Sequence, residues 1–123
     1  MTNILFIGKE VMKNLYLSDN RLEERISSRL CGLSDLRCLH LRNNPELTDI
    51  PTNLGKELTN LTELNVSHCK LKFLPPSISI CIKKEKFKLW ASGNNFSKDL
   101  SSKFDNKKLL YSFLTTENYE KYS

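Results

Sequence analysis

Pairs of apolar residues separated by one polar residue recur along the chain, and a polar turn follows each pair. The clearest three pairs are Leu15–Leu17, Leu39–Leu41 and Leu64–Val66. Side chains alternate along a strand with period two, so both apolar residues of a pair lie on one face and the residue between them points the other way. The pattern predicts short strands with one buried face.

The segments around these pairs repeat at a nearly constant interval. Three copies agree at nearly every position. A fourth, at residues 89–96, is degenerate, because Ala91 replaces its second apolar residue and Phe87 comes one residue late. A period of this length is typical of solenoid repeats. One anchor residue per copy follows the apolar pair, and the anchors lie 24, 25 and 25 residues apart: Asn20, Asn44, Cys69 and Asn94.

The anchors are predicted to be structural. A buried Asn amide has two donors and an acceptor for backbone groups that a turn leaves unpaired, whereas Cys69 offers only a weak S–H donor. Between strands, residues 47–61 and 71–78 carry apolar residues at helical or 3₁₀ intervals, and their prolines discourage a further strand. The polar stretch 81–86 predicts a looser loop.

These motifs resemble the leucine-rich repeat family, whose pattern is L-x-x-L-x-L-x-x-N/C-x-L, over residues 11–100. The resemblance implies an α/β solenoid with a short parallel β-sheet on the concave face and helical or 3₁₀ convex segments. The L-x-x-[IL]-P-x-x-[IL] segments look like those of intracellular Ras-associated and signalling scaffold proteins. The implied function is a non-enzymatic protein-interaction module whose partner is a protein such as a small GTPase or a signalling enzyme.

Three regions are predicted along the chain. Residues 1–10 form an N-terminal cap or partial repeat, residues 11–100 about four repeats, and residues 101–123 a capping helix and a tail. In the last region, Leu110, Phe113 and Leu114 have the i, i+3, i+4 spacing of one helix face. Beyond Thr115 the chain turns polar and is expected to fray.

Composition narrows the class of protein. The chain has 123 residues, 39% hydrophobic and 27% charged, with 21 leucines. This excludes collagen-like and low-hydropathy disordered chains, and the length nearly excludes a two-domain enzyme with a cleft. No apolar run approaches the roughly 18 residues of a membrane span, and no secretory signal is recognisable. We therefore expect a cytoplasmic monomer whose four cysteines are free thiols and which needs no cofactor.

The outward residues of the strands are the candidate binding surface. In the predicted register they form columns across the sheet, because adjacent strands lie about 4.8 Å apart. Aromatic and Arg side chains supply most interface hot spots, so a protein-binding role is predicted. The alternative is an ordinary solvated sheet face, and a one-residue slip of the fourth strand would bury its outward residue. The candidates are Tyr16, Ser18, Cys38, His40, Arg42, Glu63, Asn65, Ser67, Lys88 and Trp90.

Two chemical alternatives have weaker support. Cys38, His40 and Glu63 should lie close together, but a shallow sheet supplies no oxyanion site and does not exclude water, and the sequence has no CxxC or HxxxH spacing. We predict neither catalysis nor metal binding. The net charge of +5 and the lysines of residues 83–108 could attract nucleic acid or anionic lipid, but no nucleic-acid-binding motif accompanies them. Specific nucleic-acid binding is not expected.

Two other classes of protein remain open. The chain could be the targeting part of a larger leucine-rich repeat enzyme or of a ubiquitin-ligase-type protein. It could also be a pathogen or viral effector that mimics host repeat proteins. Fold alone does not decide between these possibilities.

Overall fold

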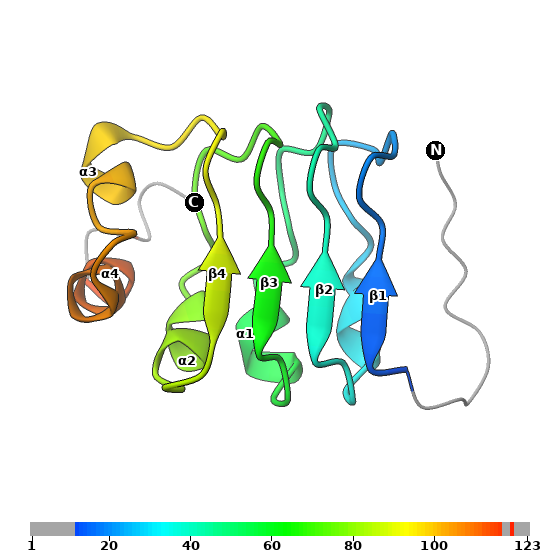
Figure 1. The fold of residues 1–123 in the computed structure, drawn as a ribbon, viewed down its shortest axis with the longest axis horizontal. Helices are drawn as coiled ribbons and strands as arrows, with labels where there is room; N and C mark the ends of the chain where they lie inside the picture. Colours follow the sequence, from blue (N-terminus) through cyan, green and yellow to red (C-terminus); the bar gives the residue numbers. More distant parts are fainter. Residues whose placement is uncertain (1–11, 117–118, 120–123) are drawn as a thin grey trace.

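The computed structural model describes residues 12–116 and residue 119, and its strands form one parallel sheet in chain order. Figure 1 shows the four strands side by side with short helices behind them. Residues 1–10, for which a cap or partial repeat was predicted, lie outside the described residues. The α/β solenoid predicted from the repeats is confirmed. The strands are β1 (Asn14–Tyr16), β2 (Cys38–His40), β3 (Glu63–Asn65) and β4 (Lys88–Trp90).

The connections behind the sheet contain the 3₁₀ helix η1 (Ser28–Gly32) and the helices α1 (Leu54–Glu57) and α2 (Ile78–Ile82). Each packs against its neighbour along the solenoid. The loop predicted at residues 81–86 is partly wrong, because its first two residues belong to α2 and are buried. The apolar spacing that begins at Ile78 continues through Ile82, which extends the helix into that stretch.

The core lies between the strands and the convex segments. Leu39 and Leu64, the central residues of β2 and β3, are wholly buried, whereas their equivalents Leu15 and Leu89 in the outer strands are only partly buried. Each interior leucine is covered by a repeat on both sides. Burying one such side chain stabilises the fold by about 1.5–3 kcal/mol, so most of the stability arises from stacking between repeats.

The register of the fourth strand follows the repeat. Leu89 pairs with Leu64 and Trp90 pairs with Asn65. Trp90 therefore points outward and Leu89 inward, and the one-residue slip considered from the sequence is wrong. Ala91 fills the second apolar position of this copy and is buried.

Two of the anchors bind backbone groups in the same way. Asn44 is wholly buried; its Nδ2 donates to the carbonyls of Leu41 (2.8 Å) and Leu17 (3.0 Å), and its Oδ1 accepts from the Leu22 N–H at 3.2 Å. Asn94 repeats this arrangement with the equivalent backbone groups of its own and the preceding repeat. Each of these anchors therefore ties its turn to the repeat before it.

The other two anchors differ from this arrangement. Cys69 is buried and donates only to the Leu41 carbonyl and, at 3.7 Å, to the Ser67 carbonyl. Asn20 is exposed and donates to the carbonyls of Leu17 and Ser18. A buried role for Asn20 is wrong, because within the described residues no repeat precedes it.

The residue before each anchor has a left-handed backbone conformation. Three of the four are not glycine, and they have φ values between 54° and 58°, which Asp and Asn tolerate better than most residues. The fourth is Gly93, with φ of 75°. A Cβ atom on Gly93 would lie 2.4 Å from Nδ1 of His68, so a side chain there would require the exposed imidazole to move. The other three are Asp19, Asn43 and His68.

The C-terminal region closes one end of the core. Helix α3 spans Lys98–Ser101, and α4 spans Lys107–Leu114 and packs against α2. Tyr119 lies within the tail that was expected to fray, but it is buried. Its hydroxyl accepts from the Leu74 N–H at 2.8 Å and donates to the Leu74 carbonyl. The sequence did not reveal the burial of Tyr119, because the residues around it are polar.

Tyr119→Phe is expected to destabilise the fold by about 1–3 kcal/mol, because a buried backbone N–H and C=O of Leu74 lose their partner. Burial raises the pKa of Tyr119 to about 12, although the Leu74 hydrogen bond lowers it in part. The protonated phenol is therefore favoured in the folded state. The contribution of the protonated Tyr119 hydroxyl to the unfolding free energy is complete below pH 10 and is lost as the pH rises toward 12.

Urea unfolding at pH 8 and pH 11 measures this contribution. The difference in unfolding free energy between wild type and Tyr119→Phe should narrow at the higher pH, because only the wild type loses this contribution. A difference that is equal at both pH values would contradict the buried, protonated assignment of Tyr119.

Candidate protein-binding surface

Three rings form a continuous stripe on the concave face. Tyr16 and His40 are paired by the register of β1 and β2, and their ring centroids lie 5.0 Å apart in an edge-on arrangement. The Trp90 ring lies 6.0 Å from that of His40, across Asn65. Tyr16 is 63% exposed and Trp90 41%. We call Tyr16, His40 and Trp90 the aromatic stripe.

Glu63 lies beside the stripe and contacts two neighbours on β2. Its Oε1 is 3.7 Å from Nε2 of His40, and its Oε2 accepts a hydrogen bond from Sγ of Cys38 at 3.5 Å. Nε2 of His40 is buried and has no hydrogen-bond partner among the described residues. The sequence placed these three residues together, and the structure does the same.

The chemistry of this trio is not that of a nucleophile. Burial raises the pKa of the Cys38 thiol, and the hydrogen bond from the thiol to Glu63 and the charge of that carboxylate raise it further. The thiol is therefore protonated near neutral pH, and a protonated thiol is a poor nucleophile. Within residues 12–116 and 119, no group of three or more His, Cys, Asp or Glu side chains could hold a metal ion. The arrangement offers hydrogen bonds and charge to a partner.

The remaining predicted residues divide by exposure. Arg42 and Lys88 are exposed, and Ser18 and Asn65 are half-buried. Ser67 was predicted as a contact residue, but it is buried, and its hydroxyl donates to Oδ1 of Asn65 at 2.6 Å. Arg42 at the equivalent position of the second repeat is exposed, so the position alone does not bury Ser67; its short side chain is bonded back to Asn65. Ser67 therefore orients Asn65 instead of facing solvent.

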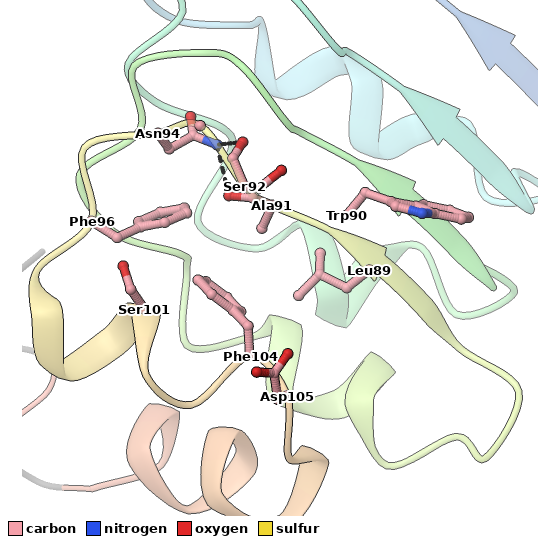
Figure 2. Close-up of a pocket in the computed structure, with 10 residues that line it drawn as sticks. Leu89, Trp90, Ala91, Ser92, Asn94, Phe96, Ser101, Phe104 and Asp105 are labelled. Carbon is pink, nitrogen blue, oxygen red and sulfur yellow. Dashed lines mark hydrogen bonds between the residues drawn. The ribbon is translucent and has the colours of Figure 1, made fainter.

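Sequence reasoning missed a pocket of about 480 Å³ beside β4. Figure 2 shows Leu89 from the strand, Phe96 from the end of the fourth repeat and Phe104 from the capping segment around it, with Ser101 and Asp105 near the same space. The two phenylalanine rings lie 5.3 Å apart. The signals in the sequence are Phe96, at the last apolar position of the fourth repeat, and Phe104, an isolated aromatic residue in a polar stretch.

Several lysines of the basic cluster contribute to the fold. Nζ of Lys84 donates to the carbonyls of Thr59 and Leu61, and Nζ of Lys107 donates to those of Lys84 and Glu85. These ammonium groups satisfy backbone acceptors at segment ends. Lys84 and Lys107 therefore have a structural role within the basic cluster.

Comparisons with known proteins agree with the fold. A family model described as "Leucine Rich repeats (2 copies)" matches residues 36–79, and one described as "Leucine Rich Repeat" matches residues 12–33. The chain is 32% identical over 71 residues to PH domain leucine-rich repeat protein phosphatase 1 of Rattus norvegicus and to the PH domain leucine-rich repeat-containing protein phosphatase 1 of Homo sapiens. The match covers 58% of this chain and 4% of each relative.

The match to these relatives concerns a repeat region, and repeats of this kind are generally non-catalytic. Among the described residues, no helix combines the length and apolarity needed to cross a bilayer. The repeating strand and turn, the anchor hydrogen bonds and both family models lead to one conclusion. The chain belongs to the leucine-rich repeat proteins.

Proposed function

We propose that this chain is a non-enzymatic interaction module that binds a protein partner through its concave sheet. The observation that supports it best is the aromatic stripe. Two large rings remain exposed at its ends, Tyr16 and Trp90, with His40 between them. Exposed aromatic side chains on a rigid sheet lose little conformational entropy on binding and are enriched among interface hot spots.

The charged residues around the stripe give the surface its specificity. Arg42 and Lys88 flank it as exposed cations, and Glu63 supplies a carboxylate that is partly exposed. A complementary partner surface carries apolar groups for the rings and opposite charges at these positions. Such a mixed surface suits a folded protein better than a lipid or a small substrate.

The finer parts of the proposal concern context. We propose a monomeric module in the cytoplasm whose partner is a signalling protein, such as a small GTPase or a signalling enzyme. The four cysteines are free thiols, and three of them are buried, which suits a reducing compartment. Because the matched relatives are much longer, we also propose that the module can act as the targeting part of a larger protein.

A combined variant tests the concave surface. Replacing Tyr16, His40, Arg42 and Trp90 together with Ala should weaken binding to a purified partner at least about 100-fold, because several hot-spot contacts are lost. Capture with the wild type identifies the partner, and calorimetry with both proteins measures the affinities.

The control variant changes exposed apolar residues of other surfaces, Ile80→Ala with Leu109→Ala, and should bind as the wild type does. Urea unfolding of each variant excludes a general loss of structure. If the combined concave variant binds as tightly as the wild type, the partner does not use this face.

A further inference from the structure

The same backbone hydrogen bonds join each repeat to the next one along the chain. One N–H just after each strand donates to the last carbonyl of the following strand, at 2.8, 2.7 and 2.8 Å, and these donors are Leu17, Leu41 and Val66. A second N–H two residues later donates to the turn of the following repeat, at 2.9, 2.9 and 2.8 Å, and these donors are Asp19, Asn43 and His68. The sheet therefore has a fixed template for adding a parallel strand.

In the fourth repeat, the N–H groups of this template have no acceptor among the described residues. The equivalent donors are the N–H groups of Ala91 and Gly93, and within the described part of the chain no strand pairs with the outer side of β4. The backbone N–H and C=O groups of Lys88 and Trp90 point toward β3. Because these groups point alternately to the two sides along a strand, those of Leu89 point to the open edge. An open edge of this kind is a template for another extended chain.

The capping segment leaves this edge accessible. The pocket of about 480 Å³ lies along β4, and its other side is formed by Phe96, Phe104 and Asp105 (Figure 2). Leu89 is only partly buried there, whereas the equivalent leucines of β2 and β3 are wholly buried. In Figure 1, α3 and α4 stand away from β4 and do not continue the sheet. The edge thus combines backbone donors that have no acceptor among the described residues with an apolar wall.

We propose that the outer edge of β4 binds an extended peptide segment of a partner protein, which adds as a parallel fifth strand. The backbone of the segment accepts hydrogen bonds from Ala91 and Gly93, as each following repeat does elsewhere in the sheet. One apolar side chain enters the pocket against Phe96 and Phe104. A basic side chain pairs with Asp105, which is exposed and makes no ion pair with another described residue.

The chemistry of the edge favours this occupant over a small molecule. Two donors at strand spacing are satisfied together by the carbonyls of an extended chain, and pockets beside the edge then select alternate side chains. Trp90 lines both the pocket and the concave face, so the added strand would extend the concave surface. The proposal does not depend on binding at the aromatic stripe.

Defined peptides test the proposal with the full chain. The probes are labelled peptides of about nine residues with alternating apolar positions, one set carrying Lys and a matched set Glu at the flanking position. Ala91→Pro removes one edge donor without touching the β3 side, and Asp105→Lys reverses the pocket charge. Asp99→Lys is the charge control, because Asp99 is exposed on α3 and does not line the pocket.

The expected results are specific to the edge. The Lys peptides should bind the wild type and Asp99→Lys with equal affinity. Their affinity for Ala91→Pro should be at least 10-fold lower. Asp105→Lys should prefer the Glu peptides. The amide resonances of Ala91 and Gly93 should shift on binding.

Three results would overturn the proposal. The first is that no peptide shifts these two amide resonances, and the second is that Asp105→Lys leaves the peptide preference unchanged. The third is concentration-dependent self-association that Ala91→Pro abolishes, because the edge would then take a second copy of this chain. If Ala91→Pro does not fold, the peptide preference of Asp105→Lys still tests the proposal.

Discussion

Gly55→Ala is expected to destabilise the protein by about 3 kcal/mol or more. A Cβ atom on Gly55 would lie 2.0 Å from the carbonyl oxygen and 2.5 Å from the carbonyl carbon of Ser77. Both are backbone atoms of the segment that leads into α2, so a rotamer change cannot relieve the clash. Relief requires α1 and α2 to separate.

That separation would also break hydrogen bonds. The Gly55 N–H donates to Oγ of Ser77 at 3.0 Å, and the same hydroxyl donates to the carbonyl of Thr52 at 2.8 Å. One serine therefore joins two consecutive convex segments at the place where the chain passes closest. Urea unfolding of the variant measures the total cost.

Gly32→Ala is the matched control. Gly32 ends the 3₁₀ helix η1, and a Cβ atom there would meet no atom within 4 Å. Its unfolding free energy should stay within about 1 kcal/mol of the wild type. If Gly55→Ala is as stable as Gly32→Ala, the close contact between α1 and the segment before α2 is wrong.

Asn44→Ala is expected to cost about 2–4 kcal/mol. The amide is wholly buried and binds the carbonyls of Leu17 and Leu41 and the N–H of Leu22. Alanine would leave the Leu22 N–H unsatisfied in the interior, which costs about 1–3 kcal/mol. It would also remove one of two donors from each carbonyl, because that of Leu17 also accepts from Asn20 and that of Leu41 from the Cys69 thiol. Thermal or urea unfolding gives the value.

Asn20→Ala is the control, because Asn20 is the anchor of the first repeat. Asn20 is exposed and donates to the carbonyls of Leu17 and Ser18, and the Leu17 carbonyl keeps Asn44 as a donor when Asn20 is replaced. Asn20→Ala should therefore cost less than about 1 kcal/mol. Equal losses in the two variants would show that burial does not set the strength of the anchor.

Much of the fold could be predicted because the repeat is redundant. The strand register follows from the spacing of the apolar pairs, and it placed Trp90 outward even in the degenerate fourth copy. The position of the Cys38, His40 and Glu63 group follows from the same register. A pattern repeated four times limits the number of consistent registers, since a slip in one strand would bury polar residues.

The unpredicted features depend on where the repeat ends. Ser67 is buried against Asn65 by a side-chain hydrogen bond that the repeat pattern does not specify, and Tyr119 is bonded to Leu74, which is 45 residues away in sequence. The pocket beside β4 is formed between Phe96, at the last apolar position of the fourth repeat, and Phe104, which belongs to no repeat position. Long-range contacts of a capping segment leave no period in the sequence, so pattern reasoning does not detect them.

The binding role of the concave face is tested most directly by fluorine NMR on the chain in complex with its captured partner. Trp90 is the single tryptophan, so 5-fluorotryptophan gives one resonance, and 3-fluorotyrosine reports Tyr16 after assignment with Tyr16→Phe. The two probes stand at opposite ends of the aromatic stripe. Saturation with partner should shift both resonances. If binding is confirmed by sedimentation while neither resonance moves, the concave-face account is contradicted.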